Sequence, residues 1–233
     1  MKAHFLSEKG IVREENQDAI LARITGESGL FVVADGVGGS QNGALASNLI
    51  VDTYNRWWED RFKENMSFFD AFEEIKEAAQ LINETVFNEY GTSVSASTLA
   101  LLFVHKKIYG VISIGDSRVY YCNQSGTQLI TRDDTLDNLP NNEMGIGSGQ
   151  LISAIGRDSY LEFSSKTDQL KHKDLFFLCS DGVYKYIAEE ELFAILASMQ
   201  SSLLFSQKGV TTIERIILTN ETQDNYSMIA VRI

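Results

Sequence analysis

The sequence predicts an α+β protein with antiparallel sheets, in which helices cover a core made of two sheets. Segments of strand character occur in clusters along the 233 residues, and one pair of long helical segments interrupts them. A strict alternation of strand and helix would instead indicate a parallel sheet. Hydrophobic residues make up 44% of the chain and proline occurs once, which is typical of a compact globular protein.

The first strands are expected at 3–9, 19–25 and 30–35, where apolar residues dominate. Two helical segments follow, at about 42–60 and 67–90. In the second of them the apolar residues have the spacing of one helix face: Phe68, Phe69, Phe72, Ile75, Ala79, Ile82 and Val86. We expect these side chains to lie in the core.

A second cluster of strands is expected at about 97–104, 107–114, 117–123 and 127–131. Residues 132–150 are polar and rich in glycine (Gly145, Gly147 and Gly149), which indicates a mobile loop. The remaining elements are strands near 160–165, 174–180 and 225–232, and helices near 188–198 and 211–219. No repeat or linker divides the chain, so we expect one domain spanning 1–233.

The charge and composition exclude several classes of function. The net charge is −12, whereas nucleic-acid binding relies on basic surface. No apolar run approaches the roughly 20 residues of a membrane span, and the N-terminal segment becomes charged too soon for a secretory signal. Cys122 and Cys179 lie in or beside predicted strands, so we expect buried, reduced thiols in a cytoplasmic protein.

Aspartate occurs in five segments where an apolar run stops and a glycine or polar turn begins: Asp18, Asp35, Asp116, Asp181 and Asp224. A strand that ends in a carboxylate and a glycine presents a hard oxygen ligand on rigid backbone. Carboxylates that gather at strand ends repel one another unless cations lie between them. The pattern therefore indicates a site for several divalent cations, which can produce hydroxide from water near neutral pH.

Each aspartate also has a simpler interpretation. Asp35 could belong to a tight Asp-Gly turn, and Asp181 and Asp224 could be turn residues or helix caps. Asp116 could lie in a two-residue hairpin turn between two strands.

The N-terminal motif also allows both a structural and a functional interpretation. Asp18 lies in a polar turn, and Arg13 is the most obvious nearby cation for an anionic substrate, although a lone arginine is usually solvated. A nucleotide-binding loop after residue 35 is excluded, because Gln41 stands where a dinucleotide loop needs its third glycine.

Six short motifs occur in a fixed order along the chain. They are Arg-x-x-Asn-Gln-Asp (13–18), Asp-Gly-x-Gly-Gly (35–39), Gly-Asp-Ser-Arg (115–118), Thr-x-Asp (131–133), Ser-Asp-Gly (180–182) and Asp-Asn (224–225). Each is weak alone, but the ordered set closely resembles the PPM family, the type 2C metal-dependent protein serine/threonine phosphatases. The match covers nearly the whole chain, and the compact length looks like the single-domain bacterial members.

The resemblance implies a four-layer α-β-β-α sandwich, with two antiparallel sheets flanked by paired helices and a binuclear Mn²⁺ or Mg²⁺ centre at one end. On the family pattern, Asp35 bridges both metals and the Gly36 carbonyl binds one of them. Asp181 and Asp224 complete the ligands of the other. Asp116 together with Asp181 resembles a third, weaker metal site.

The resemblance also implies a reaction. A hydroxide bridging the metals would hydrolyse phosphoserine or phosphothreonine in proteins, reversing a serine/threonine kinase. Asp18 matches a residue that orients water at the metals, and Arg13 matches the residue that holds the substrate phosphate. No covalent phosphoenzyme is required, which agrees with the absence of a Cys-x5-Arg arrangement.

Three residues depart from common family members. Val37 stands where many eukaryotic relatives carry a histidine thought to protonate the leaving group, so we expect a metal-bound water or the leaving group's own acidity to serve instead. Asp134 replaces a histidine beside the flap at 132–150. Lys185 occupies a position that is acidic in some relatives, and its charge should weaken the third metal site.

Two other classes of function remain open. A pseudophosphatase would act as a binding or regulatory module, but it would be expected to have lost a metal ligand. A Ca²⁺-stabilised structural protein would use a local Asp-x-Asp-x-Asp-Gly loop, which the sequence lacks.

Overall fold

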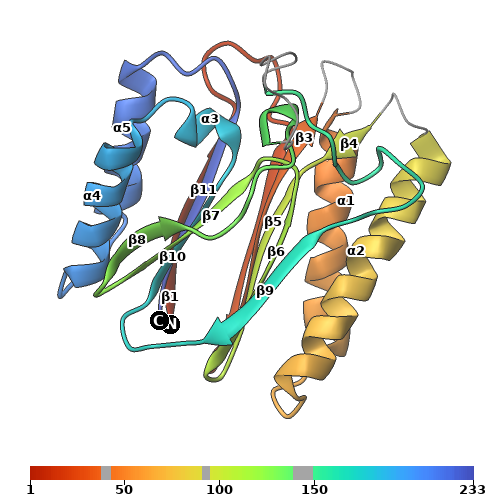
Figure 1. Ribbon diagram of the computed structural model, residues 1–233, viewed down its shortest axis with the longest axis horizontal. Helices are drawn as coiled ribbons and strands as arrows, with labels where there is room; N and C mark the ends of the chain where they lie inside the picture. Colours follow the sequence, from red (N-terminus) through yellow and green to blue (C-terminus); the bar gives the residue numbers. More distant parts are fainter. Residues whose placement is uncertain (38–42, 91–94, 139–148) are drawn as a thin grey trace.

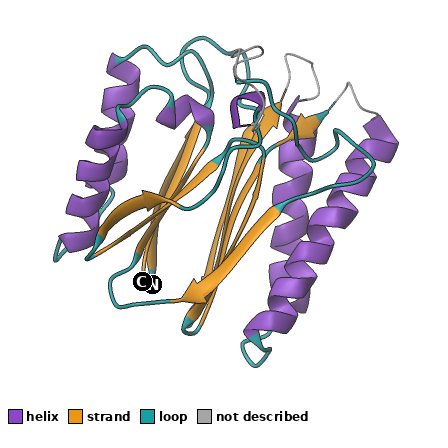
Figure 2. Cartoon of the chain, in the orientation of Figure 1, coloured by secondary structure: helices purple, strands orange, loops and turns teal. Residues whose placement is uncertain are grey.

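The computed structural model describes residues 1–37, 43–90, 95–138 and 149–233. Its strands form two antiparallel sheets that face each other, and helices cover the outer face of each sheet (Figure 1). Figure 2, coloured by secondary structure, shows the four layers as helices, sheet, sheet and helices. The predicted α-β-β-α sandwich is therefore confirmed.

The first sheet contains β1 (Lys2–Glu8), β7 (Arg118–Asn123), β8 (Gly126–Leu129), β10 (Leu175–Cys179) and β11 (Tyr226–Arg232). Its strand order is β1-β11-β10-β7-β8. The second sheet contains β2 (Asp18–Thr25), β3 (Ser28–Val37), β5 (Leu99–His105), β6 (Ile108–Ile114) and β9 (Ser164–Gln169). Its order is β2-β3-β5-β6-β9, and the short β4 (Ala96–Ser97) pairs with β3.

Helices α1 (Gly43–Arg56) and α2 (Phe68–Tyr90) cover the second sheet, and a π-helical turn, η1 (Trp57–Arg61), follows α1. Helices α4 (Glu189–Ser201) and α5 (Lys208–Thr219) cover the first sheet, together with the four-residue α3 (Asp181–Tyr184). A short 3-10 turn, η2 (Leu136–Asn138), lies in the connection after β8. Within the described ranges, no helix combines the length and apolar character needed to cross a bilayer.

Buried side chains fill the three spaces between the four layers. On β3, Leu30 and Val32 pack with the residues of α1 and α2, whereas Phe31 and Val33 pack between the sheets. Side chains alternate along a strand, so a strand covered on both faces is apolar nearly throughout. The same alternation places Asp35, two residues after Val33, on the face between the two sheets.

The turn after β6 differs from the hairpin considered for Asp116. Strand β6 belongs to the second sheet and β7 to the first, so the turn that contains Asp116 crosses from one sheet to the other. Gly115 has a φ of +84°, and a Cβ there would lie 2.8 Å from the side chain of Thr98. A hairpin turn is therefore wrong, and the crossing brings Asp116 to the end of the space between the sheets.

One further prediction is wrong in detail. The strand expected near 160–165 begins at Ser164, because the apolar Leu161 packs into the core as part of a loop and β9 consists of exposed polar residues. The short helix α3 was not predicted. The predicted loop at 132–150 can be compared only in part, because 139–148 lie outside the described residues.

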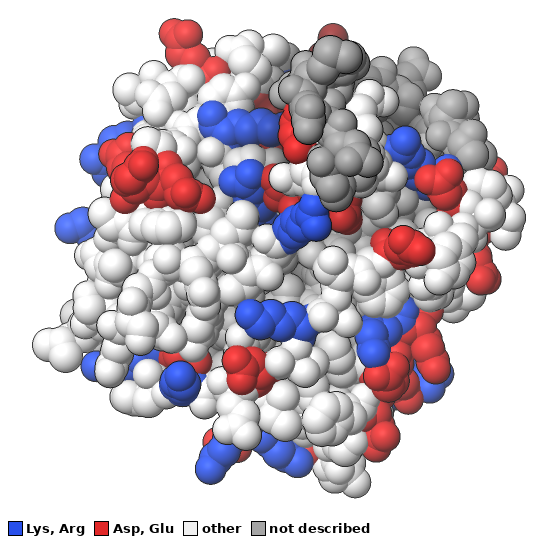
Figure 3. All heavy atoms as spheres, viewed as in Figure 1, with Lys and Arg blue, Asp and Glu red and all other residues white. Residues whose placement is uncertain are grey.

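Acidic and basic side chains are interspersed on the face shown in Figure 3. The excess of negative charge is therefore not gathered into one continuous patch on that face.

Candidate active site

Asp18 and Asp35 are neighbours on adjacent strands of the second sheet. They lie directly opposite each other in the antiparallel register of β2 and β3. The Asp35 backbone is fixed on its other side, where its N–H donates to Thr98 Oγ1 (3.0 Å) and its carbonyl accepts from the Thr98 N–H (2.9 Å) and Ser97 Oγ (2.9 Å). The strand pairing therefore holds this pair of carboxylates in place.

Ser180, at the end of β10, joins the two sheets at this point. Its hydroxyl donates to Asp18 Oδ2 (2.7 Å) and accepts from the Ser227 N–H (2.9 Å). The next residue, Asp181, begins α3 and is not a turn residue. Asp18 Oδ1 and Asp181 Oδ1 are both buried without a hydrogen-bond partner. Such oxygens are rare in proteins, because the cost of removing them from water is not recovered.

Asp116 is buried and lies beside two side chains of the segment that follows Asp181. The Tyr184 hydroxyl donates to Asp116 Oδ2 (3.2 Å). Lys185 Nζ is 2.6 Å from Asp181 Oδ2 and 3.6 Å from Asp116 Oδ2. The ammonium group of Lys185 thus contacts both carboxylates.

Residues of the Gly-Asp-Ser-Arg and Thr-x-Asp motifs are in direct contact. Arg118 forms a bidentate ion pair with Asp133, with Nη2 2.7 Å from Oδ2 and Nε 3.1 Å from Oδ1. The guanidinium also lies over the Tyr184 ring, 3.6 Å from its centroid. Asp134 accepts from the Gly115 N–H (3.0 Å), which anchors the following loop beside Asp116.

Arg13 and Asp224 come from opposite ends of the chain and form a direct ion pair. Arg13 Nη2 is 2.7 Å from Asp224 Oδ2, and both side chains are partly exposed. The hydrogen bond that Arg13 donates to Asp224 raises the pKa of Arg13 more than the charge of the carboxylate does, and partial burial acts in the opposite direction. The guanidinium remains a cation at any relevant pH.

The carboxylates are close enough to act on one another. Burial raises the pKa of Asp35 well above its usual value, and the charges of Asp18, Asp181, Asp116 and Asp224 raise it further. Burial raises the pKa of Asp18 to about 7, against hydrogen bonds from Ser180 and Ser227 that lower it. The pKa of Asp116 is also raised, first by burial and then by Asp181, although Lys185 opposes this.

The donor set fits hard divalent cations. Carboxylates and a backbone carbonyl are the ligands such ions prefer, and cations would relieve both the repulsion and the two unpaired oxygens. As the side chains lie, no three His, Cys, Asp or Glu residues of the described ranges converge as the ligands of one ion. Arg13 and Lys185 contact Asp224 and Asp181 instead, so incoming cations would exchange with these two ion pairs.

All the site residues proposed from the sequence lie at this end of the sandwich: Arg13, Asp18, Asp35, Gly36, Asp116, Asp181 and Asp224. Gly36 belongs to β3, and its N–H donates to the Gln17 carbonyl (3.2 Å). Gly38 and Gly39 of the second motif lie outside the described residues. Sequence reasoning gave no role to Ser180, Tyr184 or Asn225, and their polar contacts leave no periodic signal in the sequence.

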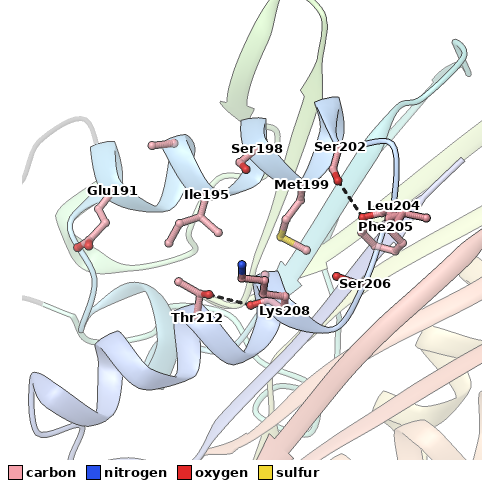
Figure 4. A pocket seen from close by; sticks show the side chains of 12 residues that line it. Glu191, Ile195, Ser198, Met199, Ser202, Leu204, Phe205, Ser206, Lys208 and Thr212 are labelled. Atoms are coloured by element: carbon pink, nitrogen blue, oxygen red, sulfur yellow. Dashed lines mark hydrogen bonds between the residues drawn. The ribbon is translucent and has the colours of Figure 1, made fainter.

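A cavity of about 450 Å³ lies between α4 and α5, and none of these carboxylates lines it (Figure 4). Ile195, Met199 and Phe205 line it, and Glu191 is the one acidic side chain among the described residues of its lining. Those residues include no cluster of titratable groups, so the cavity is not the candidate catalytic centre.

Residues 11–214 match the family described as Protein phosphatase 2C. The match covers most of the chain, which therefore belongs to the protein phosphatase 2C family. The predicted resemblance and the predicted class of enzyme, a protein serine/threonine phosphatase, are confirmed at the level of this family.

Among curated relatives, a putative protein phosphatase of Mycoplasma genitalium is 26% identical over 253 residues, covering 98% of this chain and 94% of its own. The serine/threonine phosphatase stp of Listeria welshimeri is 26% identical over 218 residues, covering 86% of this chain and 85% of its own.

Solved structures have the same fold. PppA, described as a regulatory component of the type VI secretion system in Pseudomonas aeruginosa, superposes with a TM-score of 0.85 at 29% identity, covering 100% of this chain and 97% of PppA. The catalytic domain of the phosphatase PstP, solved with two manganese ions, has a TM-score of 0.78 at 21% identity and covers 100% of this chain and 98% of its own.

Proposed function

We propose that this protein hydrolyses phosphoserine and phosphothreonine in other proteins, with two Mn²⁺ or Mg²⁺ ions bound at the candidate active site. The observation that carries the proposal is the meeting of five aspartates, contributed by both sheets, at one end of the sandwich. Their mutual repulsion and two unpaired buried oxygens are the features that divalent cations would relieve.

The residues then have distinct roles. Asp35 would hold both ions, the Gly36 carbonyl one of them, and Asp181 and Asp224 the other. When bound, the ions lower the pKa of water enough to supply hydroxide near neutral pH and offset charge on the phosphate. Asp18, held at Oδ2 by Ser180, orients water through its unpaired Oδ1.

Arg13 binds the phosphate of the substrate. Its guanidinium is partly exposed and contacts Asp224 through one nitrogen only, so other N–H groups remain for phosphoryl oxygens. Planar, bidentate donation of this kind suits a phosphate monoester and stabilises the charge spread over its oxygens in the transition state.

The comparisons support the choice of metal and substrate. The PstP catalytic domain was solved with two manganese ions, and the Listeria relative is named a serine/threonine phosphatase. We further propose that one domain spanning 1–233 acts in the cytoplasm, against phosphoproteins produced by an opposing serine/threonine kinase.

Hydrolysis of a phosphoserine peptide and a phosphothreonine peptide by the EDTA-treated protein tests the proposal. We expect no turnover without metal and restored turnover with Mn²⁺ or Mg²⁺. Mn²⁺ binding without any turnover would favour a pseudophosphatase that acts as a binding module.

Arg13→Ala should mainly weaken substrate binding. Loss of charge-assisted hydrogen bonds to phosphate should raise KM for a phosphopeptide about 10- to 100-fold, with a smaller effect on kcat. Arg23→Ala is the matched control, because Arg23 lies in β2 and pairs only loosely with Glu59 (3.9 Å). An unchanged KM in the Arg13 variant would contradict the assigned role.

Lys185→Asp should improve metal binding beside Asp116. The ammonium group now contacts Asp181 and Asp116, where a third cation would otherwise gain from both carboxylates. We expect equilibrium calorimetry to show an additional Mn²⁺, or binding tighter by about tenfold, roughly 1.4 kcal/mol. Lys76→Met in α2 is the control, and identical isotherms for wild type and Lys185→Asp would count against the idea.

A further inference from the structure

The side chain of Asn225 connects both ends of the segment that carries Arg13. Its Nδ2 donates to the Lys9 carbonyl (2.8 Å) and to the Glu15 carbonyl (2.9 Å). Its Oδ1 accepts from the Gln17 N–H (2.9 Å). The side chain is buried, and this amide orientation matches both donors and the acceptor to their partners.

The segment 9–15 has little burial of its own to hold it. Ile11 is 71% exposed and Val12 is 53% exposed, so neither side chain anchors the segment in a core. Gly10 has a φ of +76°, and a Cβ there would lie 2.5 Å from the Asp224 carbonyl oxygen. The position of the segment therefore depends on this close approach and on the hydrogen bonds of Asn225.

The backbone of Asn225 makes a second set of contacts, with the carboxylate side of the site. Its N–H donates to Asp224 Oδ1 (2.9 Å), while Arg13 contacts the other oxygen of the same carboxylate. Its carbonyl oxygen would lie 2.0 Å from a Cβ at residue 182, so only glycine fits after Asp181. Asn225 thus lies against Gly182 in α3, the carboxylate of Asp224 and the segment of Arg13.

We propose that Asn225 is a positioning residue for phosphate binding: it fixes the segment 9–15 so that the Arg13 guanidinium stays within reach of the substrate phosphate at the carboxylate site. This inference rests on the proposed phosphatase function. Asn225 touches neither phosphate nor reacting atoms in this account. It acts through Arg13, and its removal should let the segment and the guanidinium move away from the productive position.

A double-mutant cycle tests the proposal. We expect Asn225→Ala to raise KM for a phosphoserine peptide about tenfold and to change kcat much less, as a milder form of the Arg13→Ala effect. With Arg13 already removed, Asn225→Ala should have little further effect on KM, because the two residues act through one contact with substrate. A KM effect that is the same with and without Arg13 would overturn the proposal.

Hydrogen exchange gives a readout that does not depend on turnover. The Gln17 amide should exchange faster in Asn225→Ala, while the amides of β5 and β10 remain protected. Asn220→Ala is the matched control, because the Asn220 side chain donates to the Tyr186 carbonyl (2.9 Å) at the end of α5 and not to the carbonyls of the segment. The control should change neither Gln17 exchange nor KM.

If Asn225→Ala does not fold, Asn225→Ser replaces it in the cycle, because the hydroxyl can still donate to one of the two carbonyls. A KM for Asn225→Ser equal to that of wild type, with unchanged Gln17 exchange, would overturn the proposal.

Calorimetry with inorganic phosphate and Mn²⁺ distinguishes failure of the proposed phosphatase function from failure of the positioning role of Asn225. Absence of phosphopeptide hydrolysis by wild type would reject the proposed function, whereas phosphate binding that is equal in wild type and the Asn225 variant would reject the positioning role alone.

Discussion

Asp35→Asn should lower kcat/KM for a phosphoserine peptide on the order of 10³-fold at saturating Mn²⁺. The amide keeps the shape of the side chain but removes the charge that would bridge two cations. Because the backbone of residue 35 is fixed by β2, Thr98 and Ser97, the amide should occupy the same position as the carboxylate it replaces.

The same substitution should stabilise the metal-free protein. The charge of Asp35 is opposed by burial and by four other carboxylates, so its removal relieves repulsion in the folded state. Urea unfolding in EDTA measures this, and Asp168→Asn on the exposed β9 is the control. A variant with wild-type turnover would be incompatible with the assigned role of Asp35.

The metal-free protein should lose stability as the pH rises from about 4 to 7. Burial raises the pKa of Asp18 from 3.8 in the unfolded chain to about 7 in the folded protein. Below pH 4 both states hold the proton, so the contribution of Asp18 to stability is fully present. As the pH rises to 7 the unfolded state ionises first, and this contribution is lost.

The size of this effect should be a few kcal/mol, because each unit of pKa difference corresponds to about 1.4 kcal/mol. The measurement is urea unfolding of the EDTA-treated wild type and of Asp18→Asn at pH 5 and pH 8. The difference between the two proteins isolates Asp18 from the other titrating groups.

Mn²⁺ should restore stability at pH 8, by about 2.7 kcal/mol at 100 times its Kd. A difference between the two proteins that does not change with pH would contradict the burial of an ionised Asp18.

Much of the fold could be predicted because both faces of the central strands are buried. Leu30 to Ala34 and Leu99 to Val104 are apolar throughout, and α2 carries its apolar residues at helical spacing. The bounds of β9 could not be predicted, because this strand pairs through its backbone while all its side chains are polar and exposed. The turn at Asp116 that crosses between the sheets could not be predicted either. The sequence of a short turn between two strands does not indicate whether the strands belong to one sheet or to two.

The residues of the candidate site could be predicted, but the hydrogen bonds and ion pairs that connect them could not. Glycine and aspartate at strand ends leave a local signal, which is why Asp35, Asp116 and Asp181 could be selected. The hydroxyl of Ser180 and the amide of Asn225 act across more than 160 and 200 positions of sequence, respectively, so nothing near them indicates their partners. The sequence predicts that the charge of Lys185 weakens a metal site, but not that its ammonium group contacts two carboxylates. Helix α3 determines this contact, because it places Lys185 four residues after Asp181, on the same side of the turn.

Anomalous scattering from crystals grown with Mn²⁺ would locate the bound ions. The proposed metal centre should give two strong peaks beside Asp35, with Asp181 and Asp224 turned from Lys185 and Arg13 toward one of the ions. Crystals in which those two ion pairs persist, and in which no manganese lies between the sheets beside Asp35, would contradict it.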